Sequence, residues 1–441
     1  MAWDTQKQPA IVVKAGETTS YDMLVTPPVP EEEKLKEAQK IVDALPKTPA
    51  ERAARIFVEY RKLQHTVDEC ELWCLLMREL VAIGPKAVPW ICDELDQPQE
   101  DRAIRRLAFA LRAIGDPRAV PALIRAIPRT LLPPSSDYGL LVADNELTEF
   151  MQKHDLDKGS RGHYFNFGRP VREVFGTLHA LTKQDFDDLE VSGIHRSEDP
   201  RRQALQRRLF QRQATRWQTW WEANWQTFTE DEAYRSCRVE MEDTVLPPPL
   251  DLAALGKTAR VVGEGSGYVA SPAIETGNYA WHFYDLDTGY HRRWPAEFPA
   301  AEAALDSRQL ADWAAENGID LMCVTHRAAD GTETFVLRGL GMTVQEITSR
   351  DARNLERSVA GGALPKGRAV EELLMHYDES AKRLVPNADG AFLFTTREGS
   401  VGLIQTTDRV TKTADLTGSF GAPAGVGFHK GVRFDLKAIM P

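Results

Sequence analysis

The sequence predicts a mainly α-helical N-terminal region arranged as an α-solenoid, followed by an α+β domain with a mostly antiparallel sheet. The first observation is an internal repeat, because residues 82–84 recur as 113–115 at an offset of 31. The second is a rise in glycine and β-branched residues after a proline-rich stretch. The third is that pairs of apolar runs flank turn-forming residues beyond that stretch. The predicted organisation is a short β segment and proline-rich linker at 1–30, a helical repeat domain at 31–240, a linker at 241–255 and an α+β domain at 256–441.

The first thirty residues contain two short runs of strand-forming residues. Residues 11–13 and 21–25 predict two strands around a turn at 14–17. They resemble the closing strands of a small β-sandwich, a fold that needs about 100 residues. Because two strands are marginally stable alone, they either pair with another part of this chain or belong to a longer chain from which this one is cut. We favour the second alternative.

The helical region begins with residues that suit a helix N-terminus. Glu31, Glu32 and Glu33 place acidic side chains at the positive end of a helix dipole. The run Thr48-Pro49-Ala50-Glu51 has the pattern of a capping box with proline at the first helical position. A further helix is predicted from apolar side chains at helical spacing, namely Leu72, Leu76, Leu80 and Ile83.

The repeated motif reads AIGPKAVP at 82–89 and AIGDPRAVP at 113–121. Each copy predicts a helix, a glycine stop and a second helix that begins with proline. We expect Gly84 and Gly115 to adopt the left-handed conformation, and Asp116 to cap the helix after it.

This motif resembles the HEAT-like repeat of the phycobilisome-lyase type, a short two-helix unit found in many bacterial proteins. The resemblance covers residues 68–130 clearly and 31–235 loosely. It implies stacked helix pairs, but this repeat serves chromophore lyases, scaffolds and adaptors alike, so it implies no single activity. No cysteine is singled out as a chromophore ligand, and we interpret Cys70 and Cys74 as buried thiols.

The repeat pattern becomes irregular after Thr130. Helices are predicted at 145–154 and 169–181, and turn-rich loops at 131–139 and 159–168. Long loops on a rigid scaffold are common places for function. The histidines of this region have no metal-site spacing, and we interpret them as surface or packing residues: His154, His163 and His179.

A segment rich in arginine and tryptophan follows. Ala214, Trp217, Trp221 and Trp225 share one side of a helix and predict the large inner face of a terminal cap of the helical array. The functional alternative is an interaction surface formed by Arg207, Arg208, Arg212, Arg216 and Trp220. Such a surface could hold a phosphate backbone and stack bases, receive an acidic protein, or present tryptophan to a sugar.

The C-terminal domain combines predicted strands and helices, and its adjacent hairpins favour an antiparallel sheet. Hairpin turns are predicted at 329–331 and 397–400. The predicted strands are 259–262, 267–270, 279–285, 319–325, 334–338, 391–395, 401–405 and 432–436. Helices are predicted at 300–317, 349–360 and 368–377, and a glycine-rich loop at 417–431.

Several stretches of this domain resemble catalytic motifs, but each lacks a residue that the chemistry requires. Residues 287–289 read Asp-Thr-Gly, but an aspartic protease needs a second such carboxylate. A phosphatase of the haloacid-dehalogenase type needs threonine where Gly289 stands. We therefore interpret 284–289 as a turn that closes a strand. Cys323 and His326 lack an orienting third group. The sequence predicts no catalytic, cofactor-binding or metal-binding residue.

Composition limits the function further. The 441 residues carry a net charge of −11, which argues against general affinity for nucleic acid or anionic membranes. No run approaches the ~18 apolar residues of a membrane span, and the sequence start lacks the pattern of a signal peptide. Five cysteines favour a reducing compartment, so a cytoplasmic location is expected, or a periplasmic or exported one if the chain is part of a longer precursor.

Three functions remain open at this point. The favoured one is a non-enzymatic scaffold or adaptor that binds a protein partner of unknown identity on the solenoid, with no cofactor. The second is an enzyme or lyase with a site between the solenoid and the C-terminal domain, which predicts a pocket with perturbed titratable groups. The third is nucleic-acid or glycan binding through the arginine–tryptophan helix.

Overall fold

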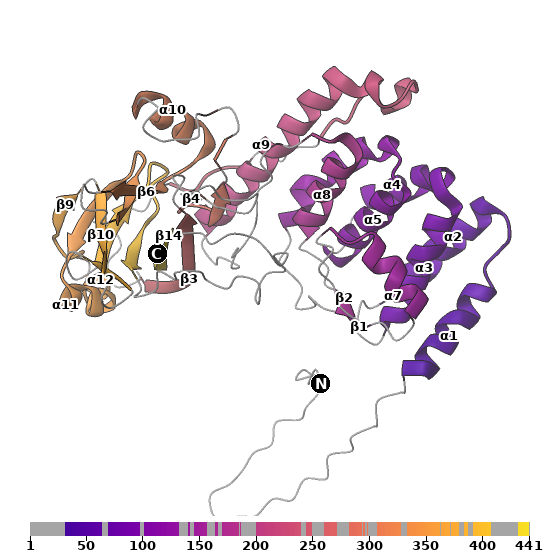
Figure 1. Ribbon diagram of the computed structural model, residues 1–441, viewed down its shortest axis with the longest axis horizontal. Coiled ribbons are helices and arrows are strands. Elements are labelled where there is room, and N and C mark those ends of the chain that lie inside the picture. Colours follow the sequence, from indigo (N-terminus) through magenta and orange to yellow (C-terminus); the bar gives the residue numbers. More distant parts are fainter. Residues whose placement is uncertain are drawn as a thin grey trace, which may run out of the picture.

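The structure is a computed structural model (Figure 1). It describes residues 31–63, 69–97, 101–131, 140–141, 145–156, 164–165, 170–184, 186, 200–239, 244–248, 260–270, 282–292, 294–295, 298, 307–327, 333–361, 363–370, 372–378, 383–386, 391–406 and 431–440. The strands predicted within 1–30 and most of the glycine-rich loop predicted at 417–431 lie outside the described residues.

The N-terminal half is helical, as predicted. Its α-helices are α1 Glu31–Asp43, α2 Pro49–Tyr60, α3 Cys70–Ile83, α4 Val88–Asp96, α5 Asp101–Ile114, α6 Val120–Ala126, α7 Asn145–Lys153, α8 Pro170–Thr182 and α9 Pro200–Asn224. Short 3-10 helices join or extend them at Gly84–Ala87, Pro117–Ala119, Ile127–Leu131, Trp225–Thr227 and Glu232–Tyr234. A two-stranded antiparallel pair, β1 (Leu140–Leu141) and β2 (Tyr164–Phe165), lies between them.

Most of these helices pack in two rows. In one row α1 contacts α3, α3 contacts α5 and α5 contacts α8, while in the other α2 contacts α4, α4 contacts α6 and α6 contacts α9. Figure 1 shows α1, α3, α5 and α8 of the first row following one another along the helical region. A shared core joins both rows, and among its fully buried side chains are Trp73, Phe109, Phe210 and Trp217.

The repeated turns have the geometry that the motif predicts. Gly84 and Gly115 have φ of +71° and +76°, where a side chain would be strained. Asp116 Oδ1 accepts a hydrogen bond from the Arg118 backbone N–H at 3.0 Å, so Asp116 caps the turn that starts the second helix. The capping box predicted at Thr48 does not form. The Thr48 hydroxyl donates to the Glu51 carboxylate at 2.6 Å, and no backbone N–H donates to the Thr48 side chain.

Polar contacts join neighbouring helices and turns of the helical region across 27 to 33 residues of sequence. Arg52 Nε donates to Glu79 at 3.1 Å across 27 residues, and Arg125 Nε donates to Asp96 at 3.0 Å across 29. Arg118 Nη2 donates to the Pro85 carbonyl at 2.8 Å across 33 residues. These separations are close to the offset of 31 between the two copies of the motif.

The C-terminal part contains two six-stranded sheets. The first has the order β11-β10-β7-β6-β4-β5 and the second the order β3-β14-β13-β12-β8-β9. Every strand pair among the described residues is antiparallel, as predicted. The strands are β3 Arg260–Ala270, β4 Phe283–Asp285, β5 Tyr290–Arg292, β6 Leu321–Arg327, β7 Glu333–Gly339, β8 Thr343–Ile347, β9 Arg368–Val370, β10 Glu372–Asp378, β11 Arg383–Pro386, β12 Ala391–Thr395, β13 Val401–Thr406 and β14 Gly431–Met440.

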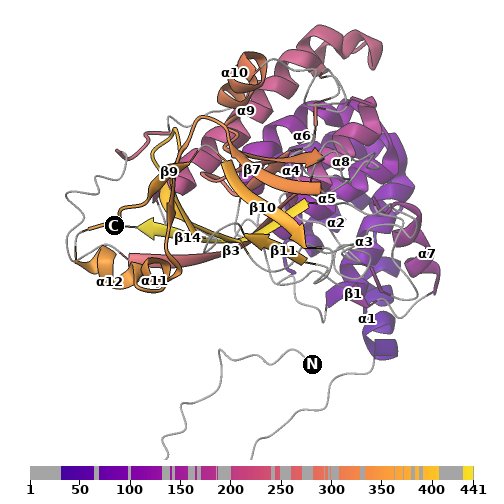
Figure 2. The same ribbon diagram turned by 60° about the vertical axis from the view of Figure 1, so that its left-hand side comes forward.

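The two sheets face each other between helices. One core between the sheets combines Leu321 and Leu337 of the first with Phe392 and Phe434 of the second. Helix α10 (Ser307–Asn317) covers the other face of the first sheet, where Leu310 packs in a core with neighbouring strand residues. Helices α11 (Ser349–Arg353) and α12 (Leu355–Ala360) cover the second sheet. Figures 1 and 2 show α10 above the strands and α11 and α12 below them.

Three of the predictions for this part need correction, and a further predicted helix is described only in part. The helix predicted at 368–377 is wrong, because β9 and β10 occupy this stretch and β10 pairs with both β7 and β11. Pairing on both sides satisfies its backbone, which outweighs the helical spacing of its apolar residues. The strands predicted at 259–262 and 267–270 form one strand, β3, because β14 pairs along its whole length. The helix predicted at 349–360 is two short helices, and the one predicted at 300–317 is described only from Ser307.

Candidate functional site

Helix α9 connects the helical rows to the sheets. Its N-terminal half carries two buried arginines, Arg201 and Arg202. Arg201 donates hydrogen bonds to the carbonyls of Pro247 and Glu398. One turn further on, the Gln206 amide donates to the Thr288 carbonyl at 2.9 Å, and both residues are buried. The helix therefore holds the turn between β4 and β5 through buried polar contacts.

An apolar contact continues this junction. The rings of Phe210 on α9 and Tyr290 on β5 meet edge to face with centroids 5.7 Å apart. Tyr290 belongs to the same buried core as the helices of the N-terminal half. The junction therefore combines aromatic packing with hydrogen bonds, which favours a fixed arrangement of α9 on the turn.

The β4–β5 turn contains the Asp-Thr-Gly sequence, and it closes a strand as predicted. Asp285 Oδ1 accepts a hydrogen bond from the Thr288 N–H at 2.9 Å, and the Asp285 carbonyl accepts one from Gly289 at 2.8 Å. Gly289 has φ of +80°, and a Cβ there would lie 3.0 Å from Nη2 of Arg202. Glycine thus permits both the turn and the close approach of the arginine.

Three buried carboxylates meet at this turn. Asp285, Asp287 and Asp320 are 2%, 3% and 1% exposed, and one potential ligand oxygen from each lies within 4.8 Å of the others. Asp320 lies just before β6, where its Oδ2 accepts a hydrogen bond from the Leu286 N–H at 2.8 Å. Thr396, after β12, donates its hydroxyl to Asp287 Oδ1 at 2.7 Å. Within the described chain, these are the carboxylates whose arrangement could hold a metal ion.

Burial shifts the titration of this cluster. Burial and then the Asp287 charge raise the pKa of Asp285 to about 7, although Thr288 and Arg202 oppose the rise. Burial also raises the pKa of Asp287 and brings that of Asp320 well above its usual value. Burial therefore disfavours the charged form of all three carboxyls, although Arg202 and Arg397 lower their pKa values.

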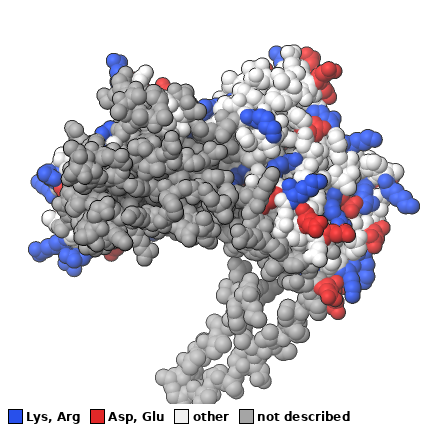
Figure 3. Space-filling view, in the orientation of Figure 1, with Lys and Arg blue, Asp and Glu red and all other residues white. Residues whose placement is uncertain are grey.

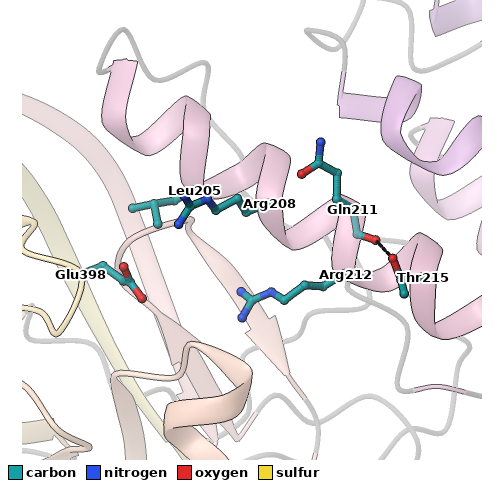
Figure 4. A pocket seen from close by; sticks show the side chains of 6 residues that line it. All are labelled: Leu205, Arg208, Gln211, Arg212, Thr215 and Glu398. Carbon is teal, nitrogen blue, oxygen red and sulfur yellow. Dashed lines mark hydrogen bonds between the residues drawn. The ribbon is translucent and has the colours of Figure 1, made fainter. Parts of the chain in front are cut away.

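A cavity of about 410 Å³ lies beside the cluster, between α9 and the β12–β13 turn (Figure 4). Its lining residues are Leu205, Arg208, Gln211, Arg212, Thr215 and Glu398. The side chains of Arg208 and Arg212 extend from the helix toward the side of the cavity where Glu398 lies. A Cβ on Gly318 would lie 3.4 Å from Asp285 Oδ2 and 3.6 Å from Arg212 Nη2, so the cavity wall and the carboxylate cluster approach each other at this glycine.

The four arginines predicted as part of an interaction surface are all exposed on α9, and Trp220 lies on the same helix. Arg208 also donates to the Thr244 carbonyl at 3.1 Å and Arg212 to the Glu316 carbonyl at 3.4 Å. The guanidinium of Arg216 lies 4.7 Å from the ring centroid of Phe186. Trp220 is partly buried and packs edge to face against Trp217. Three of the four arginines therefore also serve contacts within the chain.

Ala214, Trp217, Trp221 and Trp225 form the tryptophan stripe of α9, and this side of the helix packs inward as its spacing predicts. Ala214, Trp217 and Trp221 are fully buried, and Trp225 is 6% exposed. The Trp221 indole N–H donates to the Tyr234 carbonyl at 2.8 Å. These rings pack in the helical core, which leaves Trp220 as the edge residue of the stripe.

Among the described residues, the thiols and histidines considered in the sequence lie in packed surroundings. Cys70 and Cys74 are buried as expected, and burial raises the pKa of Cys74 well above its usual value. Burial, Lys153 and Arg112 lower the pKa of His154, which packs beside Phe150. His163 lies outside the described residues. Cys323 is buried on β6, a position that leaves a nucleophile without access to substrate.

The carboxylate cluster was not predicted from the sequence. The aspartates of the Asp-Thr-Gly turn match no complete catalytic motif, and Asp320 belongs to no motif. An Asp-x-Asp pair in a hairpin turn is a weak signal on its own. The third member lies 33 residues beyond Asp287 and becomes a neighbour only because β6 pairs with β4.

One segment of the chain matches a known family of repeats. Residues 104–127 match the family model of the PBS lyase HEAT-like repeat, which confirms the resemblance derived from the repeated motif. This segment spans most of α5, the turn at Gly115 and α6. No curated protein and no solved structure matches the chain. In the described part of the chain, every helix is too short or too polar to cross a bilayer.

Proposed function

We propose that this chain is a scaffold whose helical repeats form an α-solenoid that binds a protein partner. The observation that carries the proposal is the HEAT-like match at residues 104–127, within helices that pack in two rows. Repeats of this kind stack helix pairs into extended surfaces suited to a partner protein. The contacts between neighbouring helices and turns across 27 to 33 residues of sequence support the same arrangement.

The charge distribution favours a protein partner over a nucleic acid. On the face shown in Figure 3, acidic and basic side chains alternate over the helical region. A surface of mixed sign offers no continuous track for a phosphate backbone. The exposed arginines of α9, above all Arg207, would contact an acidic patch of the partner at the end of the array.

Affinity capture of the full chain from its source cells, followed by mass spectrometry, tests the proposal. We expect one stoichiometric protein, with cross-links to α2, α4 or α9. The doubly substituted chain Arg207→Glu/Arg216→Glu should then bind the purified partner about tenfold more weakly. Arg357→Glu, an exposed charge reversal on α12, is the matched control and should bind as the unmodified chain does. Recovery of the chain alone, or equal binding by the double variant, would overturn the proposal.

A second candidate function is a small-molecule or enzymatic site at the junction of α9 and the sheets. The cavity of about 410 Å³ lies within the usual size range of ligand pockets and combines two guanidinium groups with one carboxylate. Such a lining suits a small anion or a zwitterion. Asp285, with a pKa of about 7, could exchange a proton near neutral pH.

Calorimetric titration of the chain with a panel of carboxylates, phosphates and amino acids tests this candidate. Binding that is lost in Arg212→Gln but kept in Arg207→Gln would support it, because Arg207 lies outside the cavity. No heat from any member of the panel would count against it.

A further inference from the structure

The cavity beside α9 holds charged groups of both signs. Its volume is about 410 Å³, and its lining combines the guanidinium groups of Arg208 and Arg212 with the carboxylate of Glu398. The two arginines lie four residues apart on α9, so they share one face of the helix. Figure 4 shows both side chains extending toward the side of the cavity where Glu398 lies. Within the described chain, no ion pair joins Glu398 to either arginine, and the cavity separates the two signs of charge.

Backbone carbonyls hold the two guanidinium groups in place without neutralising them. Arg208 donates to the carbonyl of Thr244 at 3.1 Å, and Arg212 donates to the carbonyl of Glu316 at 3.4 Å. A carbonyl group accepts a hydrogen bond but carries no net charge, and each guanidinium has several N–H donors. Both arginines therefore keep charge and donors for a carboxylate that enters the cavity.

The third charged group is positioned by the β12–β13 turn. The backbone carbonyl of Glu398 accepts a hydrogen bond from Arg201 of α9. The turn also closes on itself, since the Gly399 N–H donates to the Thr396 carbonyl at 3.1 Å and the Thr396 N–H donates to the Ser400 carbonyl at 2.9 Å. These bonds use backbone oxygens and leave the Glu398 carboxylate in the lining of the cavity. Groups that are held in place before a ligand arrives lower the entropic cost of binding it.

The arrangement of these charges selects one class of ligand. A phosphate or a dicarboxylate would bind the guanidinium groups but would bring further negative charge near Glu398, whereas a simple amine would be repelled by the arginines. A molecule with one carboxylate and one ammonium group complements both sides of the cavity. Leu205 adds apolar surface to the lining, which suits an aliphatic portion of the same molecule.

We propose that this cavity binds a free amino acid. The carboxylate of the ligand lies against Arg208 and Arg212, and its ammonium group faces Glu398. This inference rests on the second candidate function, a small-molecule site at the junction of α9 and the sheets, and it names the class of ligand. Because α9 supplies the arginines and the β12–β13 turn supplies the glutamate, a bound amino acid would also join the helix to the second sheet.

Calorimetric titration of the full chain with the common L-amino acids tests the proposal. We expect at least one of them to bind with a stoichiometry of one and a Kd below about 1 mM. Two analogues of that amino acid, one without the amino group and one without the carboxyl group, then probe each charge separately. For L-leucine these analogues are 4-methylpentanoate and 3-methylbutylamine. Each analogue should bind at least about tenfold more weakly than the amino acid.

Three variants separate the roles of the charged groups. Glu398→Gln should weaken binding of the amino acid about tenfold but should not weaken binding of the carboxylate analogue, because only the contact with the ammonium group is lost. Arg212→Gln should weaken binding of both. Glu356→Gln, on α12, is the matched control and should bind as the unmodified chain does. All three positions are exposed, so the variants should fold.

Two kinds of result would overturn the proposal. If the carboxylate analogue or inorganic phosphate binds as tightly as the amino acid, or if Glu398→Gln leaves amino-acid binding unchanged, the cavity does not recognise an amino acid, while the small-molecule site itself would stand. If no amino acid, carboxylate or phosphate binds, or if Arg212→Gln binds all of them as the unmodified chain does, both this proposal and the second candidate function are wrong.

Discussion

The Gln206 side-chain amide donates to the Thr288 carbonyl at 2.9 Å, and this bond links the long helix α9 to the turn that carries the carboxylate cluster. The two residues are 82 positions apart in the sequence, and both are buried. The bond therefore links the helical rows to the sheets beside the carboxylate cluster.

Gln206→Leu tests this bond. The leucine should fill similar space but leave the buried carbonyl of Thr288 without its donor, at a cost of about 1–3 kcal/mol in the free energy of unfolding. Denaturant unfolding measures the change. Gln226→Leu, at an exposed position after α9, should change stability by less than about 0.5 kcal/mol. Equal effects of the two variants would contradict a structural role for the Gln206 bond.

The tryptophans of α9 should differ in their contribution to stability. Trp217 is fully buried, so Trp217→Ala should lower the free energy of unfolding by about 3–5 kcal/mol through cavity formation. Trp220 is only partly buried, and Trp220→Ala should cost roughly 1–2 kcal/mol. Chemical denaturation of both variants measures the difference. A larger loss from Trp220→Ala would mean that the stripe is not the inner face of the helix.

A buried ion pair joins α5 to α8. Arg112 Nη1 lies 2.7 Å from Glu173 Oε2, and their side chains are 7% and 2% exposed. Glu173→Ala should lower the free energy of unfolding by about 3–5 kcal/mol, because it leaves a buried guanidinium without its carboxylate. The matched control is Asp96→Ala, which removes the partly exposed pair with Arg125 and should cost less than about 1 kcal/mol. Thermal or urea unfolding that ranks the two variants in the opposite order would refute this assignment.

The carboxylate cluster should make stability depend on pH. The pKa of Asp285 is about 7 in the folded chain, against 3.8 for an ordinary aspartate, so the folded chain binds more protons between these values. The contribution of the Asp285 carboxyl to the free energy of unfolding is therefore greatest at or below about pH 4. This contribution falls as the pH rises toward 7. The loss should be on the order of 3 kcal/mol.

Asp285→Asn isolates this effect, because asparagine resembles the protonated acid and does not titrate. We expect the fall in stability between pH 4 and 7 to become smaller in this variant, measured by urea unfolding across this pH range. Asp312→Asn, an exposed change on α10, should leave the profile unaltered. An Asp285→Asn profile identical to that of the unmodified chain would show that another group governs the pH dependence.

The sequence by itself determined the features that depend on neighbours along the chain. The helical repeat, the positive φ at Gly84 and Gly115 and the buried tryptophan stripe follow from period, turn chemistry and side-chain spacing within a few residues. The antiparallel pairing of β12 with β13 likewise follows from the turn at Gly399, whose φ is +85°. Such patterns are physical constraints on the backbone, so a single sequence reveals them.

Only the tertiary structure decided the rest. Leu373, Leu374 and Tyr377 suit a helix or a strand, and pairing with β7 and β11 made the segment a strand. The candidate site depends on contacts between distant residues, such as Leu286 with Asp320 and Thr396 with Asp287, which are 34 and 109 positions apart. Sequence spacing carries no record of such pairs, because the folding of the sheets brings them together.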